Sequence, residues 1–169
     1  MDNVPIKDSH DMFQILISLI PVIAGGFVAI IGALSGSLLT YFLNLKSKQI
    51  EIKREKLEKL VIAANRTEKW LDDYKNTKFL QNNLDLGLNP IEEVRYLSAL
   101  YFRQLNSEVV KLSKASNKYI SLIAECHVDQ LKTGSIPNTF LEKFGTVYGD
   151  VVEANSNLLK KASEIATNM

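Results

Sequence analysis

The sequence predicts an all-α protein in which one amino-terminal transmembrane helix continues into a cytoplasmic antiparallel three-helix bundle. No Asp, Glu, Lys or Arg occurs at positions 12–45, although these residues make up 23% of the 169-residue chain. After position 45, apolar residues recur every three or four positions, as they do on the buried face of a helix. No stretch alternates apolar and polar residues at the period of two that is typical of a half-buried strand.

The expected organisation has three parts: a short extracytoplasmic tail at 1–11, a membrane segment at 12–45 with its core at 22–43, and a cytoplasmic helical bundle at 46–169. The uncharged segment is longer than the about 20 residues that one helical span needs, and too short for two spans. Pro21 suits the first turn of a helix, because proline lacks the amide hydrogen that an interior position donates. Residues 12–20 either extend the membrane helix across a kink or lie along the membrane interface.

Two alternatives to a membrane span fit the sequence less well. A chain of this size is too small to surround a wholly apolar helix on every side, which argues against a buried helix of a soluble protein. A cleaved signal peptide begins with a basic segment, whereas the first eleven residues contain one lysine and three aspartates. The apolar run is also longer than the apolar region of such peptides.

A group of cations after the apolar segment predicts its orientation. This basic collar is interleaved with three glutamates, and it consists of Lys46, Lys48, Lys53, Arg54, Lys56 and Lys59. Lys7 alone precedes the span. Because cationic flanks stay in the cytoplasm, we expect the amino terminus outside a bacterial inner membrane and the carboxyl terminus inside. The collar is expected to add a weak attraction to anionic lipid, and the same residues also fit a solvated helix face on which Glu55 pairs with Lys59.

Small residues recur along the span in two adjacent rows. We call them the small-residue stripe: Gly25, Ala29, Gly32, Ala33, Gly36, Ser37 and Thr40. Helices in lipid associate by close backbone approach, which rows of small residues four positions apart permit. The stripe therefore predicts helix–helix packing and a homo-oligomer, although glycine is also common in membrane helices that do not pair.

Three cytoplasmic helices are expected at about 46–83, 90–132 and 139–166. In the first, core positions recur every seven residues from Ile50 to Leu71, with Leu60, Thr67 and Tyr74 between them. In the second, Asn89 is expected to cap the helix, with Pro90 in its first turn.

The second helix should carry one continuous apolar stripe that includes Tyr101 and Leu105. The third is expected to begin with a capping box of Thr139 and Glu142, and to bury Leu141 among its apolar residues.

Trp70 and Tyr74 are the candidate contact for a cytoplasmic partner. They lie four positions apart, so they fall on one face of the first cytoplasmic helix. Aromatic pairs of this kind often anchor a partner helix. Packing in the core is the commoner explanation for such a pair.

Little in the sequence indicates chemistry, and we expect a non-enzymatic protein with no cofactor and no bound metal. Cys126 and His127 are adjacent, so they point in different directions on a helix and suit a core thiol beside a surface histidine better than a catalytic pair. Asp72 and Asp73 are likewise neighbours that point apart. The two histidines and one cysteine do not suffice for a Cys/His zinc cluster. Nucleic-acid binding is not expected either, because residues 60–169 carry equal numbers of cations and anions.

Positions 21–59 resemble a loose class of small bacterial single-pass membrane proteins with a cytoplasmic helical domain. The resemblance lies in Pro-Val-Ile-Ala-Gly-Gly, in Gly-Ala-Leu-Ser-Gly-Ser-Leu-Leu-Thr-Tyr-Phe-Leu, and in the charged run that follows. Some proteins of this layout are membrane effectors of phage-defence systems such as retrons, which implies membrane disruption once triggered. The resemblance covers less than a quarter of the chain and transfers no functional residue.

These observations favour an inner-membrane protein that oligomerises through its transmembrane helix and uses its helical bundle to bind a partner or sense a signal. A phage-defence or stress effector is the most concrete form of this hypothesis. One alternative is a passive adaptor that anchors a cytoplasmic partner at the membrane. Another is a holin-like protein of a phage, although the cytoplasmic part is larger than lysis requires.

Overall fold

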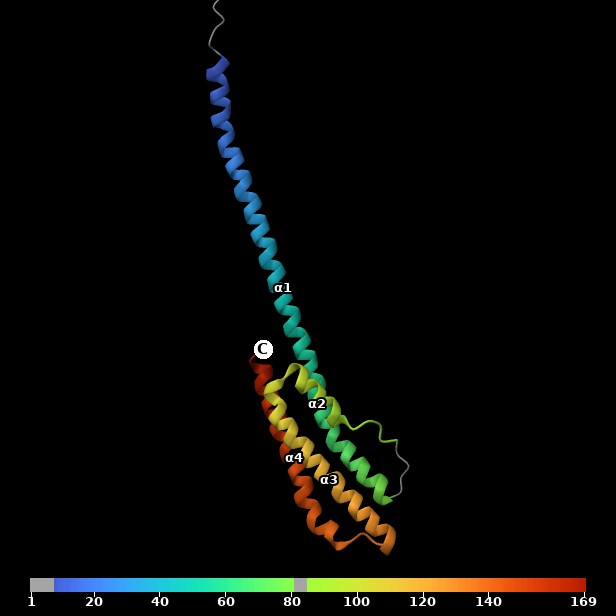
Figure 1. Cartoon of the computed structure of the whole chain (residues 1–169). Coiled ribbons are helices and arrows are strands. Elements are labelled where there is room, and N and C mark those ends of the chain that lie inside the picture. The colour runs from blue at the N-terminus through green and yellow to red at the C-terminus, as the bar shows by residue number, and fades with distance from the viewer. Residues whose placement is uncertain (1–7, 81–84) are drawn as a thin grey trace, which may run out of the picture. The chain divides into compact units, whose positions relative to one another are not determined.

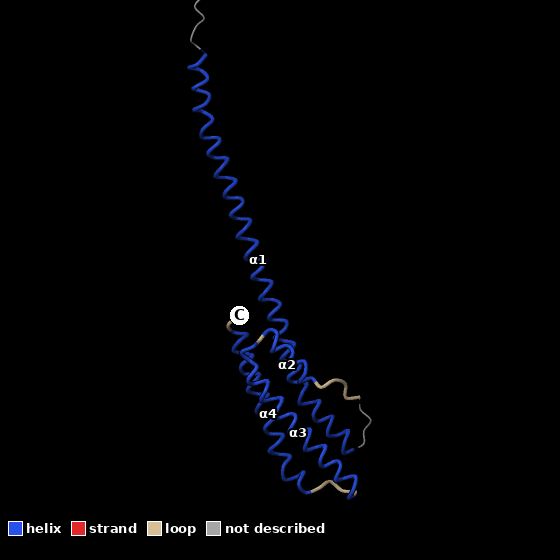
Figure 2. The backbone as a smooth tube through the Cα atoms, viewed as in Figure 1, coloured by secondary structure: helices blue, strands red, loops and turns tan. Residues whose placement is uncertain are grey.

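The computed structural model describes residues 8–80 and 85–169, and all the regular structure in these residues is helical (Figure 1). The predicted all-α class is therefore confirmed for the described part of the chain. Figure 2 shows the helices in blue and the described loops in tan. The chain divides into two compact units, Met1–Gln49 and Ile50–Met169. Because their mutual placement is not determined, each unit is described by itself.

Helix α1 (Asp8–Leu80) is a single α-helix of 73 residues with Pro21 in its interior. Residues 12–20 are thus helical and continuous with the residues that follow, as in the first of the two predicted alternatives. Pro21 does not begin the helix. The apolar part of α1 is long enough to span a membrane, which supports the coarse prediction of one candidate span near the amino terminus.

The second half of α1 supplies one wall of the core of the second unit. Most of the predicted core positions are buried, namely Leu57, Leu60, Ala64, Thr67 and Leu71, whereas Ile50 and Tyr74 are half-buried. Ala63 and Phe79 are buried as well. The heptad spacing brings these residues to one side of the helix, where burial of their apolar surface stabilises the fold. The predicted end of this helix near Asn83 lies outside the described residues.

Helix α2 (Pro90–Tyr101) begins as predicted. Asn89 is its N-cap, and the Asn89 side-chain oxygen accepts a hydrogen bond of 3.1 Å from the Ile91 amide. Pro90 occupies the first turn, where its missing amide hydrogen costs nothing. Glu92 and Glu93 follow in the same turn, close to the positive end of the helix dipole.

The structure differs from the single helix predicted over 90–132. Phe102 (φ −136°, ψ 60°) leaves the helical region, and the 3-10 turn η1 (Arg103–Leu105) leads into helix α3 (Asn106–Thr133). Tyr101 is 39% exposed and Phe102 only 1%, so the buried stripe moves by one residue at this point. A helix that continued through Phe102 would turn this large apolar side chain away from the core. The structure therefore holds four α-helices in its described part and not the three predicted after the membrane segment.

Helix α3 ends at Gly134, whose positive φ of 77° is the left-handed conformation that favours glycine at a helix end. Helix α4 (Asn138–Thr167) begins one residue earlier than predicted and has no side-chain cap, so the predicted capping box of Thr139 and Glu142 is wrong. Thr139 is the second residue of α4, so it does not occupy the position before the helix that a capping box requires. The helix buries Phe140 and leaves Leu141 72% exposed, which corrects the predicted core position.

The helices of the second unit alternate in direction. Trp70 of α1 bonds to Leu86 just before α2, and Lys53 of α1 lines the same pocket as Tyr101 and Phe102 at the end of α2. Helix α2 therefore runs back along α1. Helix α3 then packs against both α2 and α4. Phe79 of α1 meets Phe140 at the start of α4 with ring centroids 4.9 Å apart, so α4 is antiparallel to α1.

Candidate functional site

The apolar part of α1 has no packing partner within the described chain. Every described side chain between positions 12 and 45 is exposed, and the large apolar ones range from 40% exposure at Leu45 to 70% at Val28. An exposed apolar surface of this extent is rare on soluble proteins and marks a membrane or protein interaction site. The segment is therefore the first candidate functional surface.

Between Gly25 and Thr40, the small-residue stripe and the bulky residues occupy different sides of the helix. At 3.6 residues per turn, the seven stripe positions fall within an arc of about 140°. Phe27, Leu34 and Leu38 fall on the opposite side. A Cβ atom built on Gly32 or Gly36 meets no atom within 4 Å, so the shallow face that these glycines create is open in the single chain. The structure thus brings the predicted stripe residues to one face, and no described residue covers the glycines.

Hydroxyl groups in the segment bond to their own helix. Ser18 donates to the Ile15 carbonyl at 2.8 Å, Ser35 to the Ile31 carbonyl at 2.7 Å, and Thr40 to the Gly36 carbonyl at 2.8 Å. A polar hydrogen that enters hydrocarbon without a partner costs several kcal/mol. These three donors are satisfied internally, which suits a segment surrounded by lipid.

The basic collar lies on exposed turns of α1. The predicted pair is present, with Lys59 Nζ 2.7 Å from Glu55 Oε1, while Lys56 Nζ lies 3.8 Å from the same oxygen. The hydrogen bond and the attraction between Glu55 and Lys59 lower the pKa of the glutamate and raise the pKa of the lysine. Both groups are solvated, so the pair contributes little to stability.

The rings of Trp70 and Tyr74 stack on each other, so the stacked faces are not free to bind a partner. Their ring centroids are 5.5 Å apart with 13° between the planes, and both rings pack partly buried against the core. Trp70 Nε1 donates a hydrogen bond of 2.8 Å to the Leu86 carbonyl, which fixes the loop before α2. Packing in the core therefore accounts for most of the surface of the two rings. Of the two residues, Trp70 also lines a groove.

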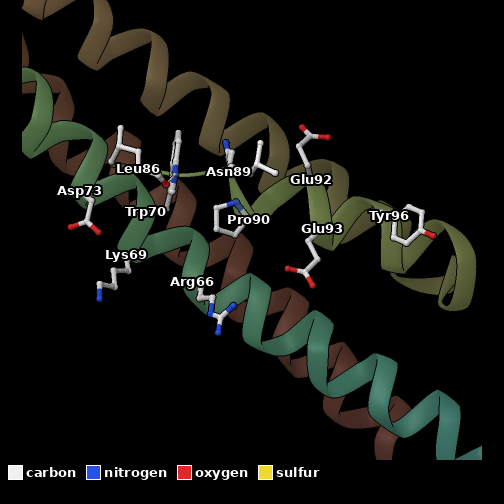
Figure 3. A pocket seen from close by; sticks show the side chains of 11 residues that line it. Arg66, Lys69, Trp70, Asp73, Leu86, Asn89, Pro90, Glu92, Glu93 and Tyr96 are labelled. Carbon is white, nitrogen blue, oxygen red and sulfur yellow. Dashed lines mark hydrogen bonds between the residues drawn. The ribbon is translucent and has the colours of Figure 1, made fainter. Parts of the chain in front are cut away.

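This groove lies between α1 and the start of α2 and has a volume of about 720 Å³. Figure 3 shows it with Trp70, Leu86 and Pro90 between the two helices. One wall carries Arg66, Lys69 and Asp73 from α1, and the other carries Glu92 and Glu93 from α2. We call this surface the α1/α2 groove. Sequence reasoning expected an antiparallel helix to start here, but it named Trp70 alone among these lining residues as a candidate contact. Which side chains line a groove between two packed helices depends on their tertiary packing.

The residues considered for chemistry are placed apart or buried. Cys126 is 4% exposed in the core, as predicted, and its burial raises the pKa of the thiol, which disfavours the nucleophilic thiolate. Asp72 bonds to Lys75 at 3.0 Å, an ordinary ion pair one turn away. Among the described residues, no group of three or more His, Cys, Asp and Glu side chains is arranged to hold a metal ion.

One buried charge was not expected from the sequence. The Glu108 carboxylate accepts hydrogen bonds from Lys161 at 2.7 Å, from Lys111 at 3.0 Å and from Ser107 at 3.0 Å. These donors lower the pKa of Glu108 to about 2, so the carboxylate stays charged. The bond to Lys161 joins the start of α3 to the end of α4, which is a structural role.

No protein-family model, curated protein or solved structure matches this chain.

Proposed function

We propose that this chain is a non-enzymatic protein of the bacterial inner membrane that oligomerises through the small-residue stripe and uses its helical unit to bind a partner or sense a signal. In this proposal the amino terminus lies outside, and residues after the basic collar lie in the cytoplasm. The most concrete form is a phage-defence or stress effector that disrupts the membrane once it is triggered.

The observation that carries the proposal is the exposed apolar segment with two unlike faces. Its bulky side suits lipid, and its glycines leave a shallow side on which a second backbone can approach closely. Helix association in lipid depends on such close packing, because apolar burial gives little gain there. The internally bonded hydroxyls support the same environment.

The continuity of α1 supports a link between the two units. Residues of the proposed span and core residues such as Leu60 and Leu71 belong to one uninterrupted helix. A rearrangement of the core is therefore expected to change how the stripe packs. Such a change would open a leak or alter access for a partner.

The membrane location is tested by fractionation. After ultracentrifugation of a detergent-free lysate, we expect the whole chain in the membrane pellet, where it should resist an alkaline carbonate wash. A monodisperse chain in the supernatant would contradict the proposal.

The role of the stripe is tested by combining Gly32→Leu with Gly36→Leu. The new side chains prevent close backbone approach, so cross-linked oligomers and growth inhibition on expression should both fall. The matched control combines Leu34→Phe with Leu38→Phe, which adds bulk on the opposite side and should leave both readouts unchanged. Unaltered oligomers and toxicity in the glycine variant would reject the proposal.

A replacement of the span separates an active role from passive anchoring. An unrelated single span in place of residues 12–45 keeps the helical unit at the membrane but removes the stripe. We expect loss of toxicity. Retention of full activity would identify the chain as a membrane adaptor.

A further inference from the structure

The α1/α2 groove has two charged walls of opposite sign. Two cations and one anion, Arg66, Lys69 and Asp73, line it from α1, so this wall is basic on balance, and Glu92 and Glu93 line it from α2. Glu92 pairs with Arg95 in its own helix at 3.1 Å. In the part of the chain that the structure describes, no ion pair involves Arg66, Lys69 or Glu93. Each wall therefore keeps charge that is available to a molecule in the groove.

Apolar side chains beside these walls are open to solvent. Leu88 is 95% exposed and Tyr96 is 63% exposed, and both line the groove. Leu100 follows one turn after Tyr96 on α2 and is 56% exposed. Exposed apolar side chains beside charged ones are the usual composition of a protein interface. The surface thus has the character of a docking site.

The arrangement of charge selects the occupant. In a twofold contact the same surface is used by both copies, so each residue type must meet its complement on the partner. A rotation that sets the basic wall of one copy against the acidic wall of another satisfies both pairs at once. A surface with a single sign of charge would instead repel itself.

We propose that a second copy of this chain docks on the α1/α2 groove through a twofold contact. Arg66 and Lys69 of each copy then face Glu92 and Glu93 of the other, and Leu88 and Tyr96 are covered beside them. The contact is distinct from the stripe. It rests on the proposed function only because a shared membrane brings the copies together.

A small contact suffices under these conditions. Interfaces of modest area bind weakly between free molecules. Copies held in one membrane, or joined by their spans, meet at a high effective concentration, and a second weak contact then adds strongly to the association. The groove contact is therefore expected to reinforce a dimer that the membrane assembles.

The test uses two charge-reversed forms of the whole chain. The first combines Arg66→Glu with Lys69→Glu, so that its groove is wholly acidic. The second combines Glu92→Lys with Glu93→Lys, so that basic residues line both walls and Asp73 is the one acidic lining residue left. Copies with two different tags are expressed together, and their co-purification from solubilised membranes is measured.

Each reversed form should co-purify with itself about tenfold less than the unmodified chain does, because like charges now face each other. The two forms together should recover the co-purification of the unmodified chain. Reversal of Lys143 and Lys160, two exposed lysines on α4, is the matched control and should have no effect. Melting curves followed by circular dichroism are used to check that every form is folded.

Two outcomes overturn the inference: undiminished self-association of each reversed form, or failure of the mixture to recover. The second outcome would assign the groove to a different protein. The same measurements in the Gly32→Leu and Gly36→Leu background separate this inference from the proposed function. If the glycine variants lose association and charge reversal has no effect, the groove contact is rejected and association through the stripe is retained. Recovery by the mixture in that background supports the groove without the stripe.

Discussion

Glu108 illustrates how a single side chain depends on residues that are distant in sequence. Its carboxylate is buried at the edge of the core and receives hydrogen bonds from three donors, one of them Lys161, which is 53 positions away. From sequence, Glu108 and Lys111 look like an exposed pair one turn apart. Only the antiparallel packing of α3 and α4 brings Lys161 close, so the role of Glu108 was not predictable from local pattern.

The variant Glu108→Gln should lower the stability of the helical unit by about 1–2 kcal/mol at pH 7, because it weakens charge-assisted hydrogen bonds. In the folded chain the pKa of Glu108 falls from its ordinary value of 4.5 to about 2. A lowered pKa contributes stability above about pH 4.5, and this contribution is lost as the pH falls toward 2. The difference in melting temperature between the two forms should therefore narrow over that range.

Circular dichroism of the whole chain in detergent micelles provides the measurement. Glu142→Gln is the matched control, since Glu142 is exposed and lies in none of the ion pairs between described residues. Its melting temperature should follow the unmodified chain at every pH. A constant difference between Glu108→Gln and the unmodified chain from pH 7 to pH 2 would contradict the assigned pKa.

Helices α1 and α3 show what apolar spacing predicts well. The heptad positions of α1 from Leu57 to Leu71 are buried as expected, and so is Cys126 of α3. The break at Phe102 escaped prediction because neither proline nor glycine marks it and because spacing of three or four continues on both sides. The competing signal was Phe102 itself, a large apolar residue that fell off the predicted stripe. The groove was missed for a different reason: its lining depends on how α1 and the start of α2 pack against each other, which the spacing of apolar residues within one helix does not specify.

Phe102→Ala should destabilise the helical unit by about 3–4 kcal/mol, the usual cost of removing a buried phenylalanine. The adjacent Tyr101→Ala should cost less than about 1 kcal/mol, because Tyr101 is 39% exposed. Urea unfolding of the two variants in the same micelles gives the comparison. A single helix over 90–132 with Tyr101 in its stripe would produce the opposite order.

At the scale of the whole molecule, composition predicts more of the organisation than the spacing of apolar residues does. The uncharged segment and the basic collar are both visible in the sequence, and the structure adds that the segment is helical and that its described side chains are exposed. The orientation in a membrane depends on the bilayer and on charge, so it remains a prediction from the collar.

Two cysteine variants measure this orientation. A maleimide that does not cross membranes should label Asn3→Cys in intact cells, and it should label Lys48→Cys only after the cells are permeabilised. The unmodified chain gives the background, because its single cysteine, Cys126, is buried. Labelling of Lys48→Cys in intact cells would reverse the assigned orientation.

Helix α1 belongs to both units, and this has a consequence for biosynthesis. Ribosomes deliver α1 first, so the apolar residues that it contributes to the core emerge well before α3 and α4 exist to cover them. A product that stops in the loop before α2 would keep the apolar segment, while Leu60 and Leu71 would remain exposed to solvent. Premature termination should therefore yield an insoluble or rapidly degraded fragment, and intact synthesis is the only route by which α1 acquires both of its environments.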